Sequence, residues 1–225
     1  MNRLHIVWDW NGTLLDDLGV VVESLNVGIA RYGLAPIVED QYRDHFTRPV
    51  RAFYDSLFGR PVSDMEWETL NKTFHDEYFE RVPGASLTVD SLVAIELVET
   101  MQWTQSVLSM SPHEELLEMV SSRGIENRFS TIAGLPAATG GLKATHLDEH
   151  LGDISLDPAD VVVIGDTPDD AVAARHVGAR VVLYDGGSHH LPTLQAMNAP
   201  VAHTLVEAVE ISDRLSRDEQ FGRSA

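Results

Sequence analysis

The stretch Asp9-Trp10-Asn11-Gly12-Thr13 follows the apolar run Leu4–Trp8 and carries the residue types of a covalent catalyst. A carboxylate that leaves a buried strand into a glycine-containing turn is well placed to attack an electrophile. Asn11 stands two residues beyond Asp9, where a proton donor is expected. Because an amide cannot exchange a proton under acid–base control, the segment predicts nucleophilic chemistry without its usual acid.

Polar residues also follow two other predicted strands. Ser109 comes directly after the stretch Gln105–Leu108, and Asp166 follows the apolar stretch Val161–Ile164. In parallel α/β sheets, ligands bind at the carboxyl ends of the strands. We therefore expect Asp9, Ser109 and Asp166 to meet at one edge of a sheet.

The acidic residues at this edge predict a metal site. Asp9 and Asp166 offer hard oxygen ligands, which suit Mg²⁺, an ion that commonly binds one or two carboxylates together with a substrate phosphate. Asp169 and Asp170 are close enough in sequence to add a ligand or to support one.

An anion site is predicted beside the metal. Ser109 and the first amides of the helix behind it would form an anion-binding corner, and Lys143 is one of two lysines in the chain. A carboxylate nucleophile, a metal, a lysine and helix amides together describe a phosphoryl-transfer site. Each feature alone has a simpler explanation, as a polar turn, a helix N-cap or a solvated lysine. The order and spacing of all four favour phosphoryl transfer.

The elements that must position these residues alternate along the chain. Strands are expected at Leu4–Trp8, Gln105–Leu108, Phe129–Ala133, Val161–Ile164 and Arg180–Tyr184. Helices between them predict an α/β fold, a doubly wound parallel sheet covered on both faces. A mostly helical block interrupts the alternation, so we predict an α/β core at 1–17 and 83–225 and a small inserted α-helical cap domain at 18–82. A polar tail is expected at Ser212–Ala225.

Composition limits the partners. The chain has 225 residues, enough for a core domain and a smaller one, and a net charge of −19, which repels nucleic acid and anionic membrane surfaces. It has no cysteine, which excludes disulfides and thiolate chemistry. No uncharged apolar run reaches membrane-spanning length, and the early Asp9 interrupts any apolar leader. We predict a cytoplasmic protein, a monomer or homodimer, that acts on a small phosphorylated metabolite.

Four motifs in order resemble those of a known family. The segments are Asp9-Trp10-Asn11-Gly12-Thr13-Leu14-Leu15-Asp16, Val107-Leu108-Ser109, Lys143 and Val163-Ile164-Gly165-Asp166-Thr167-Pro168-Asp169-Asp170. The chain resembles a haloacid dehalogenase superfamily hydrolase, and more closely a phosphoglycolate-phosphatase-like member with a helical cap inserted after the first motif. The resemblance extends from Leu4 to about Tyr184.

The resemblance implies roles for the matched residues. Asp9 would be the nucleophile that forms an aspartyl-phosphate, and Mg²⁺ would be bound by Asp9, the backbone carbonyl of Asn11 and Asp166, with support from Asp170. Phosphatases of this kind usually carry aspartate at the position of Asn11, where it protonates the leaving alcohol and then activates water. Ser109 and Lys143 would hold the phosphoryl oxygens.

The turn and the cap would add substrate contacts. Gly12 and Thr13 would shape the turn, since glycine permits close approach of the backbone to a ligand. Arg48 and Arg51 flank Pro49 in an expected loop between cap helices, from which they could bind a substrate carboxylate or second anion. The simpler interpretation is a solvated surface loop. The cap aromatics are expected to form the cap core, and His189 and His190 are expected to be loop residues.

Three outcomes of the change at Asn11 remain open. The hydrolase could be slow, because acid–base catalysis contributes roughly 10²–10⁴-fold. Another group could replace the acid, with candidates Asp16, Asp17, His45 and His75. The chain could instead be a catalytically impaired phospho-ligand-binding or regulatory protein.

Two other branches of the family rank lower. A phosphonoacetaldehyde-hydrolase-like enzyme needs a cap lysine to form a Schiff base, and the only lysine of the cap is Lys72. Arginine at 48 and 51 stays protonated and cannot form that imine. A dehalogenase-like enzyme would use Asp9 without a metal, which fits the Asp166–Asp170 pattern less well.

Overall fold

The computed structural model describes residues 4–136 and 141–222, which contain a six-stranded sheet of order β5-β4-β1-β6-β7-β8. Every neighbouring pair in the sheet is parallel. The strands are β1 (His5–Trp8), β4 (Thr104–Pro112), β5 (Ile132–Leu135), β6 (Val161–Gly165), β7 (Arg180–Tyr184) and β8 (Val201–Ala202). The predicted α/β fold with a parallel sheet is therefore confirmed.

The central strands are apolar and buried along their whole length. Every residue of β1 and of β6 is buried, as expected of strands with a helical layer on each face. The register pairs Trp8 with both Val107 and Ile164. Since the three strands are aligned at this level, the residues that follow them emerge at the same edge.

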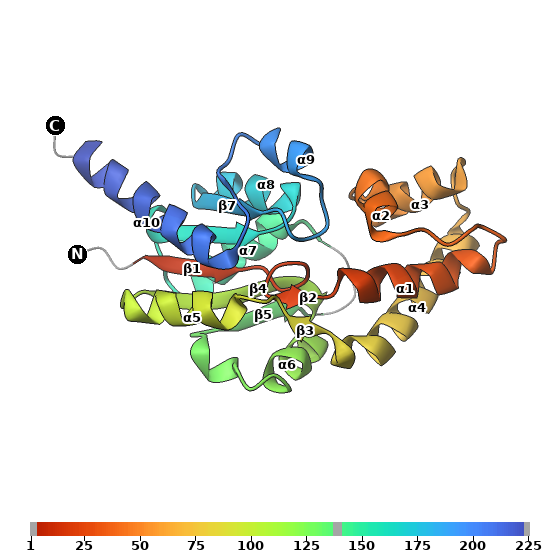
Figure 1. Ribbon diagram of the computed structural model, residues 1–225, viewed down its shortest axis with the longest axis horizontal. Helices are drawn as coiled ribbons and strands as arrows, with labels where there is room; N and C mark the ends of the chain where they lie inside the picture. The colour runs from red at the N-terminus through yellow and green to blue at the C-terminus, as the bar shows by residue number, and fades with distance from the viewer. Residues whose placement is uncertain (1–3, 137–140, 223–225) are drawn as a thin grey trace.

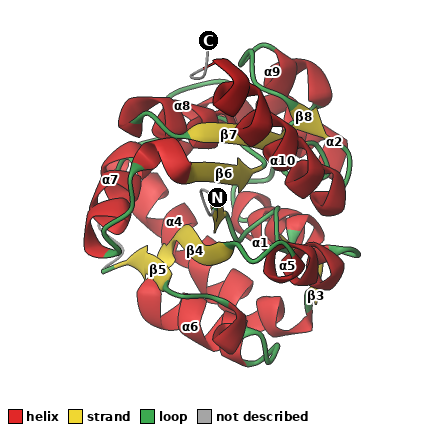
Figure 2. Ribbon diagram, turned by 90° about the vertical axis from the view of Figure 1, so that its left-hand side faces the viewer, coloured by secondary structure: helices red, strands yellow, loops and turns green. Residues whose placement is uncertain are grey.

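Helices cover the sheet on both faces (Figure 2). One face is covered by α5 (Ser91–Thr100), α6 (His113–Ser121) and α10 (Leu205–Gly222), whose apolar residues share one core cluster with β1. The opposite face is covered by α7 (Lys143–Asp153), α8 (Pro168–Val177) and α9 (Leu191–Gln195). In the described ranges, no helix is both long and apolar enough to span a membrane.

Four helices form a separate lobe beside the sheet (Figure 1). They are α1 (Leu18–Ala30), α2 (Glu39–His45), α3 (Val50–Phe58) and α4 (Asp64–Arg81), and they enclose a hydrophobic cluster of their own. We call this lobe the cap. The helices break near Arg48-Pro49, as expected, and again at Gly59. Helix α4 begins after the N-cap residue Ser63, which forms a capping box with Glu66. The division at 18–82 into two domains stays a prediction.

A short antiparallel pair stands where the chain enters and leaves the cap. β2 (Leu15–Asp16) pairs with β3 (Ser86–Leu87). The turn Val82–Gly84 precedes β3 as a single 3-10 turn. The two strands hold the cap's ends together next to the nucleophile motif.

Three predicted elements differ from the structure. β4 runs beyond Leu108 to Pro112 through an irregular register, so the following helix begins only at His113. The strand expected at Phe129–Ala133 lies at Ile132–Leu135. Most of the expected polar tail belongs to α10, because Leu205, Ala208, Val209 and Ser212 are buried at helical spacing. Residues 223–225 of that tail lie outside the described ranges.

Candidate active site

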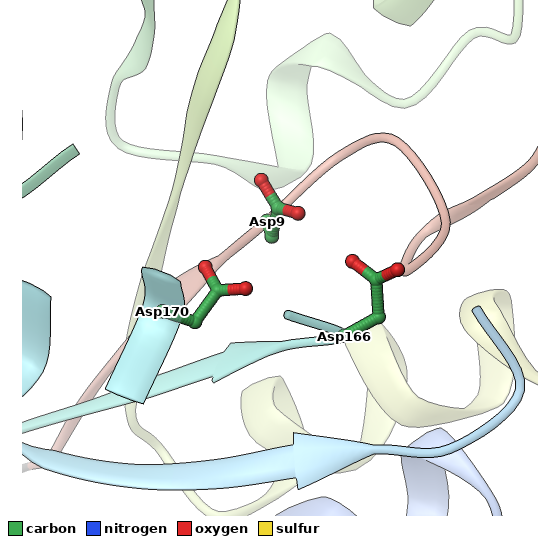
Figure 3. A group of neighbouring side chains, drawn as sticks. All are labelled: Asp9, Asp166 and Asp170. Atoms are coloured by element: carbon green, nitrogen blue, oxygen red, sulfur yellow. The ribbon is translucent and has the colours of Figure 1, made fainter. Parts of the chain in front are cut away.

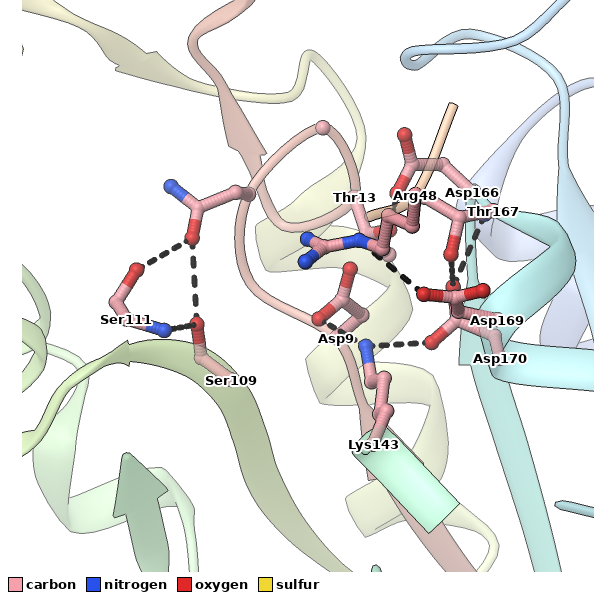
Figure 4. Close-up of polar contacts among 12 residues, drawn as sticks. Asp9, Thr13, Arg48, Ser109, Ser111, Lys143, Asp166, Thr167, Asp169 and Asp170 are labelled. Atoms are coloured by element: carbon pink, nitrogen blue, oxygen red, sulfur yellow. Dashed lines mark hydrogen bonds and ion pairs between the residues drawn. The ribbon is translucent and has the colours of Figure 1, made fainter. Parts of the chain in front are cut away.

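The site is centred on an ion pair between Asp9 and Lys143. Asp9 follows β1, is buried, and donates its backbone N–H to Ile164 O of β6 at 2.8 Å. Lys143 is the first residue of α7 and is also buried. Its Nζ lies 2.5 Å from Asp9 Oδ1 and 2.5 Å from Asp170 Oδ1, between the two carboxylates (Figure 4).

Three carboxylates converge at this edge of the sheet (Figure 3). Asp9, Asp166 and Asp170 each offer an oxygen, and these oxygens lie within 4.8 Å of one another. The turn at Gly12 brings the backbone close to them: its φ is 70°, and a Cβ there would lie 2.5 Å from Asp166 Oδ2. Only glycine fits both the conformation and the space.

Hydrogen bonds hold the carboxylates in place. Asp166 Oδ2 accepts from the Ser188 backbone N–H at 2.6 Å, and the Thr13 hydroxyl faces Asp166 Oδ1 at 3.4 Å. Asp170 Oδ2 accepts from the hydroxyl and the backbone N–H of Thr167, at 2.7 and 3.0 Å. This leaves Asp170 Oδ1 to face Lys143.

Burial and neighbouring charges together raise the pKa values of Asp9, Asp166 and Lys143. Burial raises the pKa of Asp9 well above its usual range, the Lys143 ammonium opposes this, and Asp170 and Asp166 add to it. Burial and the Asp170 charge raise the pKa of Asp166 to about 6. Burial lowers the pKa of Lys143, but the charges of Asp170 and Asp9 outweigh it and raise the pKa above its ordinary value.

The cluster fits a hard divalent cation. All its ligand atoms are carboxylate oxygens, which suit Mg²⁺. Three acidic side chains face one lysine, so a cation would neutralise the remaining negative charge. Burial is the main cause of the raised pKa of Asp166, and the negative charge of Asp170 adds to it.

Asn11 is fully hydrogen-bonded on both ends of its amide. Its Nδ2 donates to Asp17 Oδ2 at 2.8 Å and to the Tyr78 hydroxyl at 2.7 Å. Its Oδ1 accepts from the hydroxyls of Ser109 at 3.2 Å and Ser111 at 2.8 Å. The donors and acceptors around it match an amide, so an aspartate there would meet the Asp17 carboxylate directly.

Among the groups considered as a replacement acid, two line the cavity beside Asp9. They are Asp17 and His75. Asp17 accepts hydrogen bonds only, from Asn11, Tyr78 and the Gly12 N–H, as an ionised carboxylate does. His75 Nδ1 lies 2.7 Å from Asn71 O. His45 is exposed beside Ser56, and Asp16 is exposed in β2.

The cap closes over the site and forms a cavity of about 250 Å³ above Asp9. Ser109 and Lys143 line it from the core, and Arg48 lines it from the cap, where its Nε lies 3.2 Å from Asp169 Oδ2. Arg51 does not reach the cavity, because its guanidinium donates to Val62 O and pairs with Asp64 inside the cap. Of the two expected arginine contacts, the structure thus brings one to the site.

Lys72 also lies away from the cavity. Its Nζ is 2.6 Å from Asp76 Oδ2 on the exposed face of α4. No lysine in the described cavity lining comes from the cap. This geometry gives no support to Schiff-base chemistry.

Several site residues were not found from the sequence. Tyr78, expected in the cap core, reaches Asn11 and Asp17 with its hydroxyl. Ser188 holds Asp166 through its backbone, and the Gly186-Gly187-Ser188 turn after β7 is the signal that could have pointed to it. The same loop meets the cap, where Arg43 Nε donates to Gly187 O at 2.9 Å.

Comparisons with known proteins find relatives over most of the chain. The sequence profile described as haloacid dehalogenase-like hydrolase matches residues 6–184. A phosphoglycolate phosphatase of Mesorhizobium japonicum is 26% identical and covers 96% of this chain and 98% of its own. An N-acetylmuramic acid 6-phosphate phosphatase of Pseudomonas aeruginosa is 24% identical over 84% of this chain and 85% of its own. A haloacid dehalogenase-like family hydrolase from Streptococcus pneumoniae has the same fold, with a TM-score of 0.79, 18% identity and coverage of 93% and 98% of the two chains.

Proposed function

Because the chain belongs to the haloacid dehalogenase-like hydrolases, we propose that it is a magnesium-dependent phosphatase that hydrolyses a small phosphorylated metabolite through a phosphoryl intermediate on Asp9. The relatives that are phosphoglycolate and N-acetylmuramic acid 6-phosphate phosphatases support a phosphoric monoester as the substrate. The cytoplasmic location and the monomeric or dimeric state remain predictions from sequence.

One observation carries the proposal: Lys143 bridges Asp9 and Asp170 while Asp166 completes a cluster of three carboxylates. The Lys143 ammonium opposes the effect of burial on the pKa of Asp9 and so favours the ionised carboxylate, the form that acts as a nucleophile. The lysine and a cation held by the three carboxylates would also neutralise the oxygens of an incoming phosphoryl group.

The reaction would proceed in two steps. Asp9 attacks phosphorus, the bond from phosphorus to the leaving oxygen breaks, and the leaving group carries away the electron pair. Lys143 and Ser109 hold the phosphoryl oxygens during this transfer. A magnesium ion held by Asp9, Asp166, the Asn11 carbonyl and Asp170 supplies charge neutralisation at phosphorus when bound. Water then cleaves the acyl phosphate and restores Asp9.

Asn11 weakens both steps for an alkyl phosphate. The amide cannot protonate a departing alkoxide, and it cannot take a proton from the attacking water. The Asn11 amide is hydrogen-bonded to Asp17, Tyr78, Ser109 and Ser111. These bonds stabilise the turn but supply neither the acid nor the base. We therefore propose a slow phosphatase for substrates whose leaving group needs protonation.

Acetyl phosphate with Mg²⁺ tests the proposal, because its leaving acetate needs no proton. We expect phosphate release, loss of release with EDTA, and a phosphorylated Asp9 in acid-quenched samples analysed by mass spectrometry. The Asp9→Asn variant should show neither. Absence of release and of the phosphorylated peptide in the wild type would refute the phosphatase.

A second candidate function is phospho-ligand binding without turnover. The complete hydrogen bonding of the Asn11 amide favours it, because the groups around position 11 match an amide and not an acid. Phosphate binding with micromolar affinity in Mg²⁺, measured by calorimetry on a protein inactive toward acetyl phosphate, would select this function.

A further inference from the structure

The cap gives the cavity an apolar, aromatic wall. The side chains that form it include Leu25, Phe46, Val50, Phe53, Phe74 and Phe79. The phosphoryl-binding groups Ser109 and Lys143 lie on the core side. The part of a substrate beyond its phosphoryl group therefore faces mainly hydrocarbon and aromatic rings, with Asn71 and His75 as polar side chains of the same wall.

The charged groups of the cavity give little room for a second anion. Arg48 and Lys143 are its cations among the described lining residues, and both are already paired with carboxylates. Asp17 and Asp169 add negative charge to the same lining. A substrate carboxylate would have to share Arg48 with Asp169, which lies 3.2 Å from its Nε and already offsets part of its charge, so the structure favours an uncharged leaving group.

Asn11 adds a requirement on the leaving oxygen. With an amide in place of the acid, the leaving group must depart as a stable anion. A phenol meets this requirement far better than an alcohol, because its anion is delocalised into the ring. The apolar wall and the missing acid thus point to the same chemical class.

We propose that the substrate of this site is an aryl phosphate, a phosphoric monoester of an uncharged phenol whose ring packs against Phe46, Phe53, Phe74 and Phe79. The inference rests on the proposed phosphatase function. A cavity of about 250 Å³ has room for a ring beside the phosphoryl group, since an apolar cavity of roughly 150 Å³ takes up benzene.

The proposed reaction balances without an added acid. Asp9 forms a bond to phosphorus, the phosphorus–aryl oxygen bond breaks, and the phenolate leaves with the electron pair. Water then adds its oxygen to phosphorus, the acyl oxygen returns to Asp9 as carboxylate, and the two water protons leave on phosphate or to solvent. No oxidant, reductant or further co-reactant is needed.

The specificity is tested by comparing kcat/KM for phenyl phosphate, p-nitrophenyl phosphate, cyclohexyl phosphate, acetyl phosphate and phosphoglycolate in Mg²⁺. We expect both aryl phosphates to exceed phosphoglycolate by at least about tenfold, and cyclohexyl phosphate to be the poorest. Equal or higher values for phosphoglycolate or cyclohexyl phosphate would overturn the aryl class. Loss of all activity, acetyl phosphate included, would instead refute the phosphatase.

The affinity for phosphonates that are not hydrolysed tests the effect of the apolar wall apart from the effect of the leaving group. Phenylphosphonate, methylphosphonate and phosphonoacetate carry the same phosphoryl-like group and cannot be hydrolysed as esters. Their inhibition constants can be measured in competition with acetyl phosphate turnover. We expect phenylphosphonate to bind at least about tenfold more tightly than methylphosphonate. Phosphonoacetate binding more tightly than phenylphosphonate would show that the cavity selects a carboxylate and would overturn the proposal.

Matched cap variants test the wall itself. Phe46→Leu and Phe74→Leu remove a ring that lines the cavity, whereas Phe58→Leu removes a cap ring that packs on Tyr32 and Arg60. The first two should lower phenylphosphonate affinity several-fold relative to methylphosphonate, and Phe58→Leu should leave the ratio unchanged. An unchanged ratio in both cavity variants would contradict ring packing.

Discussion

The Tyr78 hydroxyl of cap helix α4 donates to Asp17 Oδ2 at 2.5 Å, so a residue of the cap holds the carboxylate that in turn accepts from Asn11. Asp17 has three donors, with the Gly12 N–H as the third at 2.8 Å. The cap is therefore bonded to the nucleophile turn itself. Burial raises the pKa of Asp17, and the hydrogen bonds from Tyr78 and Asn11 oppose that shift.

Tyr78→Phe should lower the free energy of unfolding by about 1–3 kcal/mol, because a buried carboxylate loses a donor. Urea denaturation at pH 7 measures this. Tyr54→Phe is the control, since Tyr54 is also buried in the cap and its hydroxyl has no hydrogen bond within the described ranges. Equal losses in the two variants would show that the Tyr78 bond adds no stability of its own.

Asn11→Asp alone should raise the turnover of alkyl phosphates by less than the full gain expected from a general acid at this position. The new carboxylate would lie against Asp17, which now accepts from the Asn11 amide at 2.8 Å. The double variant Asn11→Asp with Asp17→Asn exchanges donor and acceptor and keeps the pairing. We expect it to exceed the single variant in kcat for cyclohexyl phosphate, toward the roughly 10²–10⁴-fold that an acid contributes. A single variant as fast as the double would refute the like-charge argument.

The phosphoenzyme should accumulate with p-nitrophenyl phosphate. The first step needs no acid with this leaving group, while the second lacks the base that activates water. Rapid mixing should show a burst of nitrophenolate close to one equivalent per active site. The double variant described above should reduce the burst, and a linear time course in the wild type would show that dephosphorylation is not limiting.

Lys143→Met should abolish turnover and destabilise the metal-free protein. Removal of the ammonium leaves Asp9 and Asp170 buried without their counter-charge, which typically costs about 3–5 kcal/mol. Mg²⁺ should restore part of that loss, because the bound cation supplies these carboxylates with the positive charge that the lysine no longer provides. Thermal unfolding with EDTA and with Mg²⁺ measures both effects, and Lys72→Met, at an exposed pair, should change neither.

Stability should fall in mild acid through a buried histidine pair. Ser106 Oγ lies 2.8 Å from both His5 Nε2 and His150 Nε2, and burial lowers the pKa of each histidine to about 4. The folded state therefore keeps both neutral where the unfolded chain, near pKa 6.5, is already protonated. Stability is complete above about pH 6.5 and decreases as the pH falls toward 4, by about 1.4 kcal/mol per pH unit for each histidine.

Denaturation at pH 7 and pH 5 checks this dependence against His150→Gln, which can keep a hydrogen bond to Ser106. The variant should lose a smaller part of its stability between the two pH values than the wild type. An identical decrease in both proteins would assign the acid sensitivity to other groups.

The strands and the polar residues that follow their carboxyl ends could be predicted from the sequence, because the patterns that indicate them are local. Apolar runs such as Val161–Ile164 predict buried parallel strands, and whatever follows them must emerge at one edge. The same reasoning brought Asp9 and Asp166 together correctly. It misjudged β4, because the register irregularity after Leu108 depends on the neighbouring strand.

Residue types and their spacing were enough to predict the α/β class, the order of the four motifs and the loss of the acid at Asn11. The surroundings of that amide could be known only from the folded chain, because Tyr78, Ser111 and Asp17 reach it from separate elements. Tertiary packing also places Arg48 at the cavity, whereas the partly exposed Arg51 bonds to Val62 and Asp64 of the cap. Residue type and spacing predict local structure and the chemistry that a side chain can perform. The wall of a cavity, in contrast, is formed by side chains far apart in sequence, and their directions depend on tertiary packing.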